Sequence, residues 1–238
     1  YGQSLHYQQR ESSKLVKDLQ KLQDEYDCHH FFFVDEASSP RALRELSSGL
    51  MEKGLNIKWA TCARFEPALT GDLCRSLAKT GCKMLMFGLE SGCERVLSLM
   101  GKGTSPERIR RVLRESAQAG IWNHVFVFFG FPTETEEEAE ETIAFFMDNL
   151  DNIHSVAAGT FILEKHARVS KSPQDFGIKR IIRKSDSDLA FQYDYETERG
   201  MSRQQAAATA QRFSRLVTTR RQPRVYFYDV YDLLYASH

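Results

Sequence analysis

Cysteine is scarce in this sequence, and no two cysteines stand at a spacing typical of a metal or redox motif. The five are Cys28, Cys62, Cys74, Cys82 and Cys93, and no pair is arranged as CxxC. The spacing therefore gives little support to a zinc knuckle or a thioredoxin-like motif. We expect reduced thiols and a cytoplasmic protein, because free cysteines are usual in reducing compartments.

Long apolar runs and an excess of one charge are also absent. No run approaches the roughly 18–20 residues that a membrane span requires, and residues 1–6 lack the basic and then apolar order of a signal peptide. Lys and Arg together number 32, as do Asp and Glu. We therefore expect no membrane or nucleic-acid partner, and recognition of any ligand by a local site. The first residue is not Met, which predicts a fragment or a processed product.

One short stretch, Cys28-His29-His30, has the composition of a metal site. Successive side chains that enter a strand point to opposite faces, so these three do not converge easily on one ion. We predict no metal ligands among the residues of this chain.

What the sequence does contain is a regular alternation of helical and strand patterns. Apolar residues at helical spacing predict a helix over residues 11–26, and Pro40 predicts the first turn of another that ends at Gly54. Nearly continuous apolar segments predict five buried strands, at residues 30–34, 55–62, 84–87, 125–129 and 155–163. Strands of this kind, separated by helices, indicate a parallel sheet. Right-handed crossovers would curl this sheet into a barrel or wind it doubly.

The later part of the chain has a weaker pattern. Thr135 with Glu138 predicts a capping box for a helix that runs to about residue 150. Residues 165–183 are basic and irregular, Ser202 is placed to cap a helix, and residues 225–231 are aromatic. We expect a core over residues 1–177 and an accessory segment over 178–238 that packs beside the sheet.

Polar residues or glycine follow four of the predicted strands, where ligands bind in parallel β/α folds. A carboxylate accepts hydrogen bonds from both hydroxyls of a ribose, and Arg or Lys pairs with an α-carboxylate. Such a set predicts a zwitterionic, sugar-bearing ligand, although acids at these positions also favour helix N-termini. Lys102, between two glycines, lies in a turn that can face the same edge. The four groups are Asp35-Glu36, Arg64 with Glu66, Glu90-Ser91, and Gly130 with residues 133–135.

Several motifs, in order, resemble the radical S-adenosylmethionine (SAM) enzymes. The most similar branch is the one whose members often carry an N-terminal cobalamin-binding domain, and the likeness extends from residue 11 to residue 177. The motifs are FFVDEA at 32–37, Trp59 with Arg64, FGLESG at 87–92, RVL at 95–97, MGKG at 100–103, FFGFPTET at 128–135, FIL at 161–163 and PQDFG at 173–177.

The resemblance implies a partial, open β/α barrel with SAM across the strand ends. It also implies a role for each matching residue. Asp35 and Glu36 match the position that holds the methionine amino group, Glu90 the one that binds the ribose hydroxyls, and Lys102 a basic residue that pairs with the methionine carboxylate. Arg64 matches another position that faces the cofactor. The stretch 128–130, which includes Phe128 and Gly130, matches the backbone beside the adenine. Ser91 is adjacent to these positions.

The chain departs from the family in one respect. The family holds its [4Fe–4S] cluster with a CxxxCxxC loop after the first strand, and this sequence contains no such loop. The resemblance therefore implies that the chain is truncated just after that loop, with the first strand and the cluster ligands upstream of Tyr1.

The function that the resemblance implies is that of a radical SAM enzyme, which generates a 5′-deoxyadenosyl radical when complete and is inactive as this chain alone. The implied substrate is a small molecule or a peptide, methylated or otherwise modified, with possible use of cobalamin and with a flavodoxin or ferredoxin as electron donor. A cluster-less barrel that binds a ligand or partner without catalysis is the alternative. A third reading is an unrelated β/α barrel that uses Asp35, Glu36 and Glu90 for acid–base chemistry.

Overall fold

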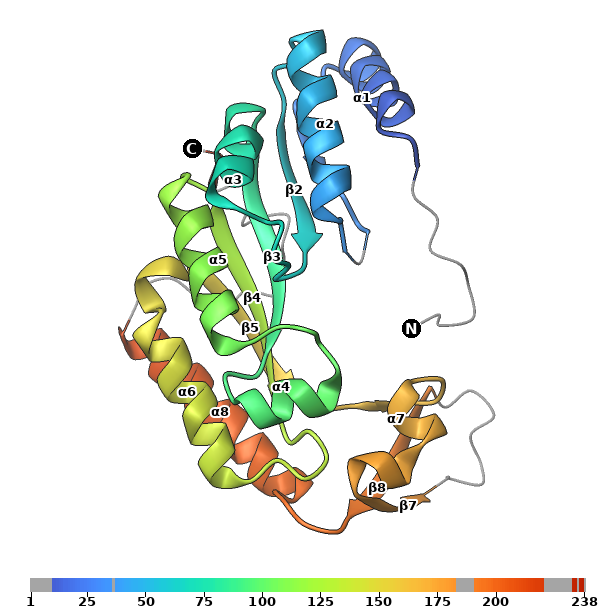
Figure 1. Ribbon diagram of the computed structural model, residues 1–238, viewed down its shortest axis with the longest axis vertical. Coiled ribbons are helices and arrows are strands. Elements are labelled where there is room, and N and C mark those ends of the chain that lie inside the picture. Colours follow the sequence, from blue (N-terminus) through green and yellow to red (C-terminus); the bar gives the residue numbers. More distant parts are fainter. Residues whose placement is uncertain (1–9, 36, 183–190, 221–232, 235, 238) are drawn as a thin grey trace.

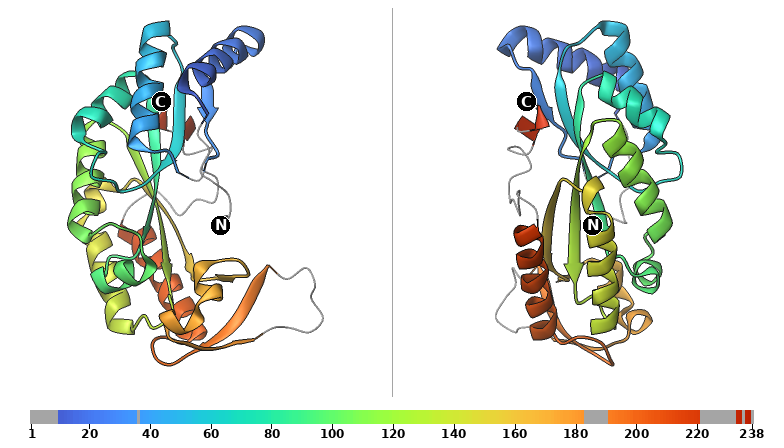
Figure 2. Two further views of the ribbon diagram at one scale, coloured as in Figure 1. Left: turned by 45° about the vertical axis from the view of Figure 1, so that its right-hand side comes forward. Right: turned by 90° about the vertical axis from the view of Figure 1, so that its left-hand side faces the viewer.

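A computed structural model describes residues 10–35, 37–182, 191–220, 233–234 and 236–237 of the 238-residue chain. Five strands pair in parallel in the order β1-β2-β3-β4-β5, which is also their order in the sequence. They are β1 (His30–Phe32), β2 (Lys58–Ala63), β3 (Cys82–Glu90), β4 (Trp122–Phe129) and β5 (Ser155–Thr160). The sheet curls into a half-barrel with helices along its outer side (Figures 1 and 2). The predicted open β/α barrel is thus confirmed, and a doubly wound sheet is excluded.

Helices connect the strands, and α2, α3, α5 and α6 begin at side-chain caps that the sequence encodes. The side chains of Ser39, Thr70, Ser105 and Thr135 each accept a hydrogen bond from a backbone N–H of the first turn, which satisfies a group with no partner inside the helix. The predicted capping box of Thr135 and Glu138 is present. The helices are α1 (Ser12–Tyr26), α2 (Pro40–Lys53), α3 (Gly71–Lys79), α4 (Glu94–Met100), α5 (Pro106–Gln118) and α6 (Glu136–Asp148).

The sheet is apolar on both faces, as expected for parallel strands covered on each side. On the outer face Phe87, Val125 and Phe129 pack in the main core with residues of the surrounding helices. On the concave face Met84 and Met86 pack with partly buried residues of β2 and β4. Leu233, near the end of the chain, belongs to this concave cluster and is 2% exposed.

A second, smaller sheet follows the half-barrel and corrects two expectations. Its antiparallel order is β6-β8-β7, with β6 (Leu163–Glu164), β7 (Ile178–Ile182) and β8 (Gln192–Thr197). The fifth strand of the main sheet therefore ends at Thr160 rather than continuing to residue 163. The segment 165–183 contains α7 (Arg168–Lys171), the 3-10 helix η2 (Pro173–Phe176) and β7 rather than only irregular chain. These elements are short, and β6 pairs with β8 across the intervening α7, η2 and β7, so local periodicity does not indicate them.

Helix α8 (Arg203–Arg220) returns the chain to the main sheet, where it lies against β4 and β5. Phe213 on this helix is fully buried, and its ring lies 5.5 Å from that of Phe129 and 4.9 Å from that of Phe146 on α6. The C-terminal segment thus packs beside the sheet, while the division of the chain at residue 177 stays a prediction. The aromatic stretch 225–231 lies outside the described residues.

The five strands run in one direction, so their carboxyl ends meet at one edge of the half-barrel (Figure 1). The small sheet lies at the same end of the molecule (Figure 1). Within the described residues, no helix has both the length and the apolar character that crossing a membrane requires.

Candidate cofactor site

An acid and a base from two different segments meet at the carboxyl edge of the sheet. Glu90 is the last residue of β3, and Lys102 lies in the turn after α4. The Lys102 Nζ donates to Glu90 Oε1 at 2.7 Å, and the two side chains are 39% and 14% exposed, respectively. The pair is therefore partly accessible to solvent at the carboxyl edge of the sheet.

The backbone at Glu90 is unusual for a residue with a side chain. Its φ angle is +62°, in the left-handed region, and the register of the β3–β4 pairing shifts between Gly88 and Glu90. A Cβ atom added at Gly88 would lie 2.4 Å from Glu90 Oε1, so the glycine leaves the space in which the carboxylate sits. A non-glycine residue in this region costs about 1–3 kcal/mol, and such residues cluster at ligand-binding sites.

Ser91 lies apart from this pair. Its side chain is fully buried, its Oγ lies 2.9 Å from Thr142 Oγ1 of α6, and it accepts a hydrogen bond from Cys93 N at 3.1 Å. Gly92 beside it also faces α6, because an added Cβ would lie 2.5 Å from Phe145 Cβ. The structure therefore directs this part of the loop toward α6 and not toward Glu90 and Lys102.

Arg64 and Asp35 lie at the ends of the neighbouring strands. The Arg64 Nη2 donates to the carbonyl oxygen of Lys102 at 3.2 Å, which joins the end of β2 to the Lys102 turn. Both residues line a cavity of about 460 Å³ between α1, α2 and the ends of β1 and β2, together with the hydroxyls of Ser38 and Thr61. Glu36, the other predicted acid here, lies outside the described residues.

The turn after β4 is closed by the buried carboxylate of Glu134, which belongs to the predicted group at residues 133–135 but was given no role of its own there. Glu134 Oε2 accepts hydrogen bonds from Gly130 N at 2.5 Å and from Phe131 N at 3.2 Å. The residue is 1% exposed, and burial raises its pKa to about 7. Its Oε1 has no hydrogen-bond partner among the described residues.

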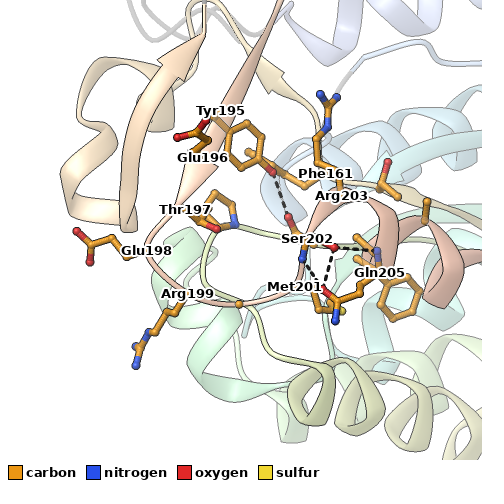
Figure 3. A pocket seen from close by; sticks show the side chains of 17 residues that line it. Phe161, Tyr195, Glu196, Thr197, Glu198, Arg199, Met201, Ser202, Arg203 and Gln205 are labelled. Carbon is orange, nitrogen blue, oxygen red and sulfur yellow. Dashed lines mark hydrogen bonds between the residues drawn. The ribbon is translucent and has the colours of Figure 1, made fainter.

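A second cavity, of about 600 Å³, borders the same turn (Figure 3). It lies between the ends of β4 and β5, the chain that follows β8, and the start of α8. Tyr195 on β8 donates to the carbonyl oxygen of Gly130 at 3.3 Å, and burial raises the pKa of its hydroxyl to about 12. The Tyr195 ring lies 5.9 Å from that of Phe161. Of the predicted site residues, Gly130 lines this cavity, whereas Phe128 packs in the apolar cluster beside it.

The described cysteines do not fit an iron–sulfur cluster. Burial raises the pKa of the Cys74 thiol to about 11 and that of Cys82 well above its ordinary value, which disfavours the thiolate that iron requires. Among the described residues, no three His, Cys, Asp or Glu side chains are grouped closely enough to hold a metal ion.

The chain is similar to several proteins of one enzyme superfamily. The Radical SAM superfamily matches residues 3–146. An uncharacterised methyltransferase of Pyrococcus horikoshii is 28% identical over 135 residues, which cover 56% of this chain and 29% of that protein. The cytidylyl-2-hydroxyethylphosphonate methyltransferase of Streptomyces wedmorensis is 29% identical over 141 residues, which cover 56% of this chain and 25% of that protein.

Solved structures agree with the fold. The radical SAM methyltransferase TsrM of Kitasatospora setae, solved with cobalamin and a [4Fe–4S] cluster, superposes with a TM-score of 0.55 at 21% identity. The match covers 66% of this chain and 32% of TsrM. The chain thus spans about a quarter to a third of the length of these relatives.

The family match covers more than half of the chain, and the resemblance found in the sequence motifs is confirmed. SAM and a [4Fe–4S] cluster are the cofactors of this family, and a relative with bound cobalamin belongs to the branch that the motifs indicate. The chain belongs to the radical SAM superfamily.

Proposed function

We propose that this chain is the SAM-binding part of a radical SAM enzyme, with the cofactor across the carboxyl ends of β2, β3 and β4. The observation that carries the proposal is the Glu90–Lys102 pair, in which a carboxylate and an ammonium group meet at the edge where ligands of such folds bind. The Glu90 carboxylate would accept the ribose hydroxyls, and the Lys102 ammonium group would pair with the methionine carboxylate.

The other predicted residues would complete the site. Asp35 and Glu36 would hold the methionine amino group, and Arg64 fixes the Lys102 turn through its hydrogen bond to the Lys102 carbonyl. The backbone of residues 128–130 would flank the adenine, and Glu134 holds two of the N–H groups in the adjoining turn. SAM that binds a reduced [4Fe–4S] cluster supplies radical chemistry in this family. In this proposal the ligands of that cluster are not among the described residues.

We further propose that the whole protein methylates, or otherwise modifies, a small molecule or a peptide. Two similar proteins are named as methyltransferases, and TsrM was solved with cobalamin bound, which supports the use of cobalamin. The proposal includes a flavodoxin or ferredoxin as electron donor and a cytoplasmic setting.

The lack of cluster ligands among the described residues favours a second candidate, a barrel that binds SAM or a related ligand without radical chemistry. The acid–base alternative receives less support, because Glu90 pairs with Lys102 while Asp35 lines the separate cavity beside α1 and α2. Formation of 5′-deoxyadenosine by the longest natural form of the protein, after anaerobic cluster reconstitution, separates an enzyme from the cluster-less candidate.

Two ligands test how the site divides its contacts. SAM carries a methionine carboxylate, whereas 5′-methylthioadenosine has the same adenosine without it. We expect Lys102→Ala to weaken SAM binding about tenfold, since an ion pair to a charged group contributes about 1.5–3 kcal/mol. The same change should weaken the binding of 5′-methylthioadenosine less than that of SAM, because this ligand loses only the support that Lys102 gives to the Glu90 carboxylate.

Isothermal titration of both ligands makes the comparison, with Lys79→Ala, a change in the last turn of α3, as the matched control. Equal losses for the two ligands, or no loss for either, would contradict the assignment of Lys102 to the methionine carboxylate.

A further inference from the structure

Arg95, near the start of α4, directs its whole guanidinium group to a different part of the chain. Its Nη2 donates to Thr133 O at 3.0 Å and to Glu138 Oε2 at 2.6 Å. Its Nη1 donates to Thr133 Oγ1 at 3.3 Å, and its Nε bonds to Glu138 Oε1. The side chain is 39% exposed, whereas that of Glu138 is 14% exposed. A guanidinium group that donates to two residues together, here Thr133 and Glu138, fixes the position of one relative to the other.

Thr133, which receives two of these bonds, has a backbone conformation that its side chain disfavours. Its φ angle is +69°, and the residue is 7% exposed. A β-branched residue in the left-handed region is rare and needs support from its surroundings. Two glycines leave room for it, because a Cβ at Gly177 would lie 2.5 Å from Thr133 Cγ2 and one at Gly200 would lie 2.8 Å from Thr133 Cα.

The two segments that Arg95 joins are the two halves of the candidate cofactor site. On one side, α4 connects the loop after Glu90 to the turn that carries Lys102. On the other side, Thr133 is followed directly by Glu134, which holds the N–H groups of Gly130 and Phe131. Glu138 also accepts a hydrogen bond from Thr135 N at 2.9 Å in the capping box of α6. The guanidinium thus connects the β3 loop, the β4 turn and the start of α6.

We propose that Arg95 is a positioning residue that holds the turn after β4 at a fixed position relative to the Glu90–Lys102 pair. It would thereby set the distance between the parts of the site that receive the adenine and the ribose of SAM. This inference rests on the proposed function. Arg95 itself need not contact SAM, because its side chain bonds to Thr133 and Glu138 in the part of the chain that the structure describes.

Two variants and a control test this role in the full 238-residue chain. Arg95→Ala removes all four hydrogen bonds. Arg95→Lys keeps the positive charge beside Glu138, but a lysine ammonium group cannot donate to Glu138 and Thr133 together as the planar guanidinium does. The control is Arg212→Ala, because Arg212 on α8 pairs with Glu140 on the same helix α6 but does not contact the turn. Both ion pairs join α6 to another element, so a general effect of losing such a pair appears in the control.

Isothermal titration with SAM gives the first readout. We expect Arg95→Ala to weaken SAM binding about tenfold, a change that corresponds to about 1.4 kcal/mol, and Arg95→Lys to weaken it less. Arg212→Ala should leave the affinity unchanged. A purely structural role would lower the melting temperature of Arg95→Ala without a change in affinity, and that result would contradict the inference.

Thr133→Gly gives a second, independent readout. Glycine adopts a φ of +69° without steric cost, so a turn with glycine at 133 depends less on Arg95. In that background the additional effect of Arg95→Ala on affinity should shrink by at least about threefold, which is a coupling of the kind that residues in contact show. Full additivity of the two changes would contradict the proposed link through Thr133.

Hydrogen exchange of the ligand-free chain separates this inference from the proposed function. The peptide over residues 128–135 should exchange faster in Arg95→Ala than in wild type and in Arg212→Ala, and this readout needs no SAM. Wild-type protein that does not bind SAM would overturn the proposed function, and with it the role of Arg95 toward SAM. Wild-type protein that binds SAM, combined with unchanged exchange and affinity in both Arg95 variants, would overturn the inference alone.

Discussion

Glu90, the last residue of β3, and Thr133, in the turn after β4, both have left-handed backbone conformations although neither is glycine. Each is held by specific neighbours: Glu90 by the Lys102 ammonium group and the space above Gly88, and Thr133 by Arg95 and by the space that Gly177 and Gly200 leave. Conformations of this kind persist only where the surroundings fix them. The site thus depends on residues that lie outside the set expected to contact the cofactor.

The ionisation of Glu134 gives a prediction at the residue scale. Its pKa is about 7 in the folded chain against an ordinary value of 4.5, because burial disfavours the charged form. Between those two values the folded state binds more protons than the unfolded state, so the free energy of unfolding contributed by this group falls as pH rises from about 4.5 to about 7. Above about pH 7 the free energy of unfolding is lower than at pH 4.5 by roughly 3 kcal/mol at most, as far as this group is concerned.

Glu134→Gln removes this titration and keeps a carbonyl oxygen that accepts from Gly130 N and Phe131 N. We expect the variant to gain stability relative to wild type on going from pH 5 to pH 8, as measured by urea unfolding at both values. Glu115→Gln, which changes a carboxylate that pairs with Arg111 on α5, is the control. A stability difference between Glu134→Gln and wild type that is the same at both pH values would show that Glu134 does not titrate in this window.

At the scale of elements, α8 is where the C-terminal segment joins the main core. Phe213 is fully buried between Phe129 of β4 and Phe146 of α6. We expect Phe213→Ala to lower the free energy of unfolding by about 3–5 kcal/mol, the usual cost of removing a buried Phe side chain. Chemical denaturation measures it, with Phe191→Ala as the control because Phe191 is 79% exposed.

A loss below about 0.5 kcal/mol, within the range of ordinary surface changes, would show that α8 is not part of the cooperative core. The division of the chain at residue 177 would then describe two independent units. A single transition that shifts as a whole would instead show that the sheet and α8 unfold together.

Sequence patterns were sufficient for the main sheet and its helices, because these signals are local. Apolar strands, capping residues such as Thr135, and the helix-ending Gly54 act within a few residues of their own position. The small sheet was missed, since β6 and β7 are short and β6 pairs with β8 across α7, η2 and β7. Pairing of that kind depends on tertiary contacts that periodicity does not contain.

The candidate site was predictable in part for a related reason. Residues at the strand ends, such as Glu90 and Arg64, could be placed because parallel strands bring their carboxyl ends to one edge. Ser91 was placed with them by adjacency in the sequence, but its hydroxyl turns to Thr142. The roles of Arg95 and Glu134 depend on where a long side chain reaches in three dimensions, and no spacing rule gives that direction.

At the scale of the whole molecule, three sets of polar groups lie at one end of the half-barrel. The Glu90–Lys102 pair, the Arg64–Asp35 cavity and the turn around Gly130 all follow the carboxyl ends of parallel strands. The second sheet and the start of α8 border the same end. These groups share one edge of the fold, and we propose that SAM binds there through Glu90.

The affinity of SAM for Glu90→Ala, measured by isothermal titration and compared with a thermal melt, tests that claim most directly. A desolvated carboxylate that accepts two ribose hydroxyls makes charge-assisted hydrogen bonds worth about 1.5–3 kcal/mol each. We therefore predict that the dissociation constant rises at least tenfold, since about 1.4 kcal/mol is one decade, with a melting temperature close to that of the control Glu94→Ala. Unchanged affinity with a lowered melting temperature would contradict the account, because Glu90 would then serve the loop and not the cofactor.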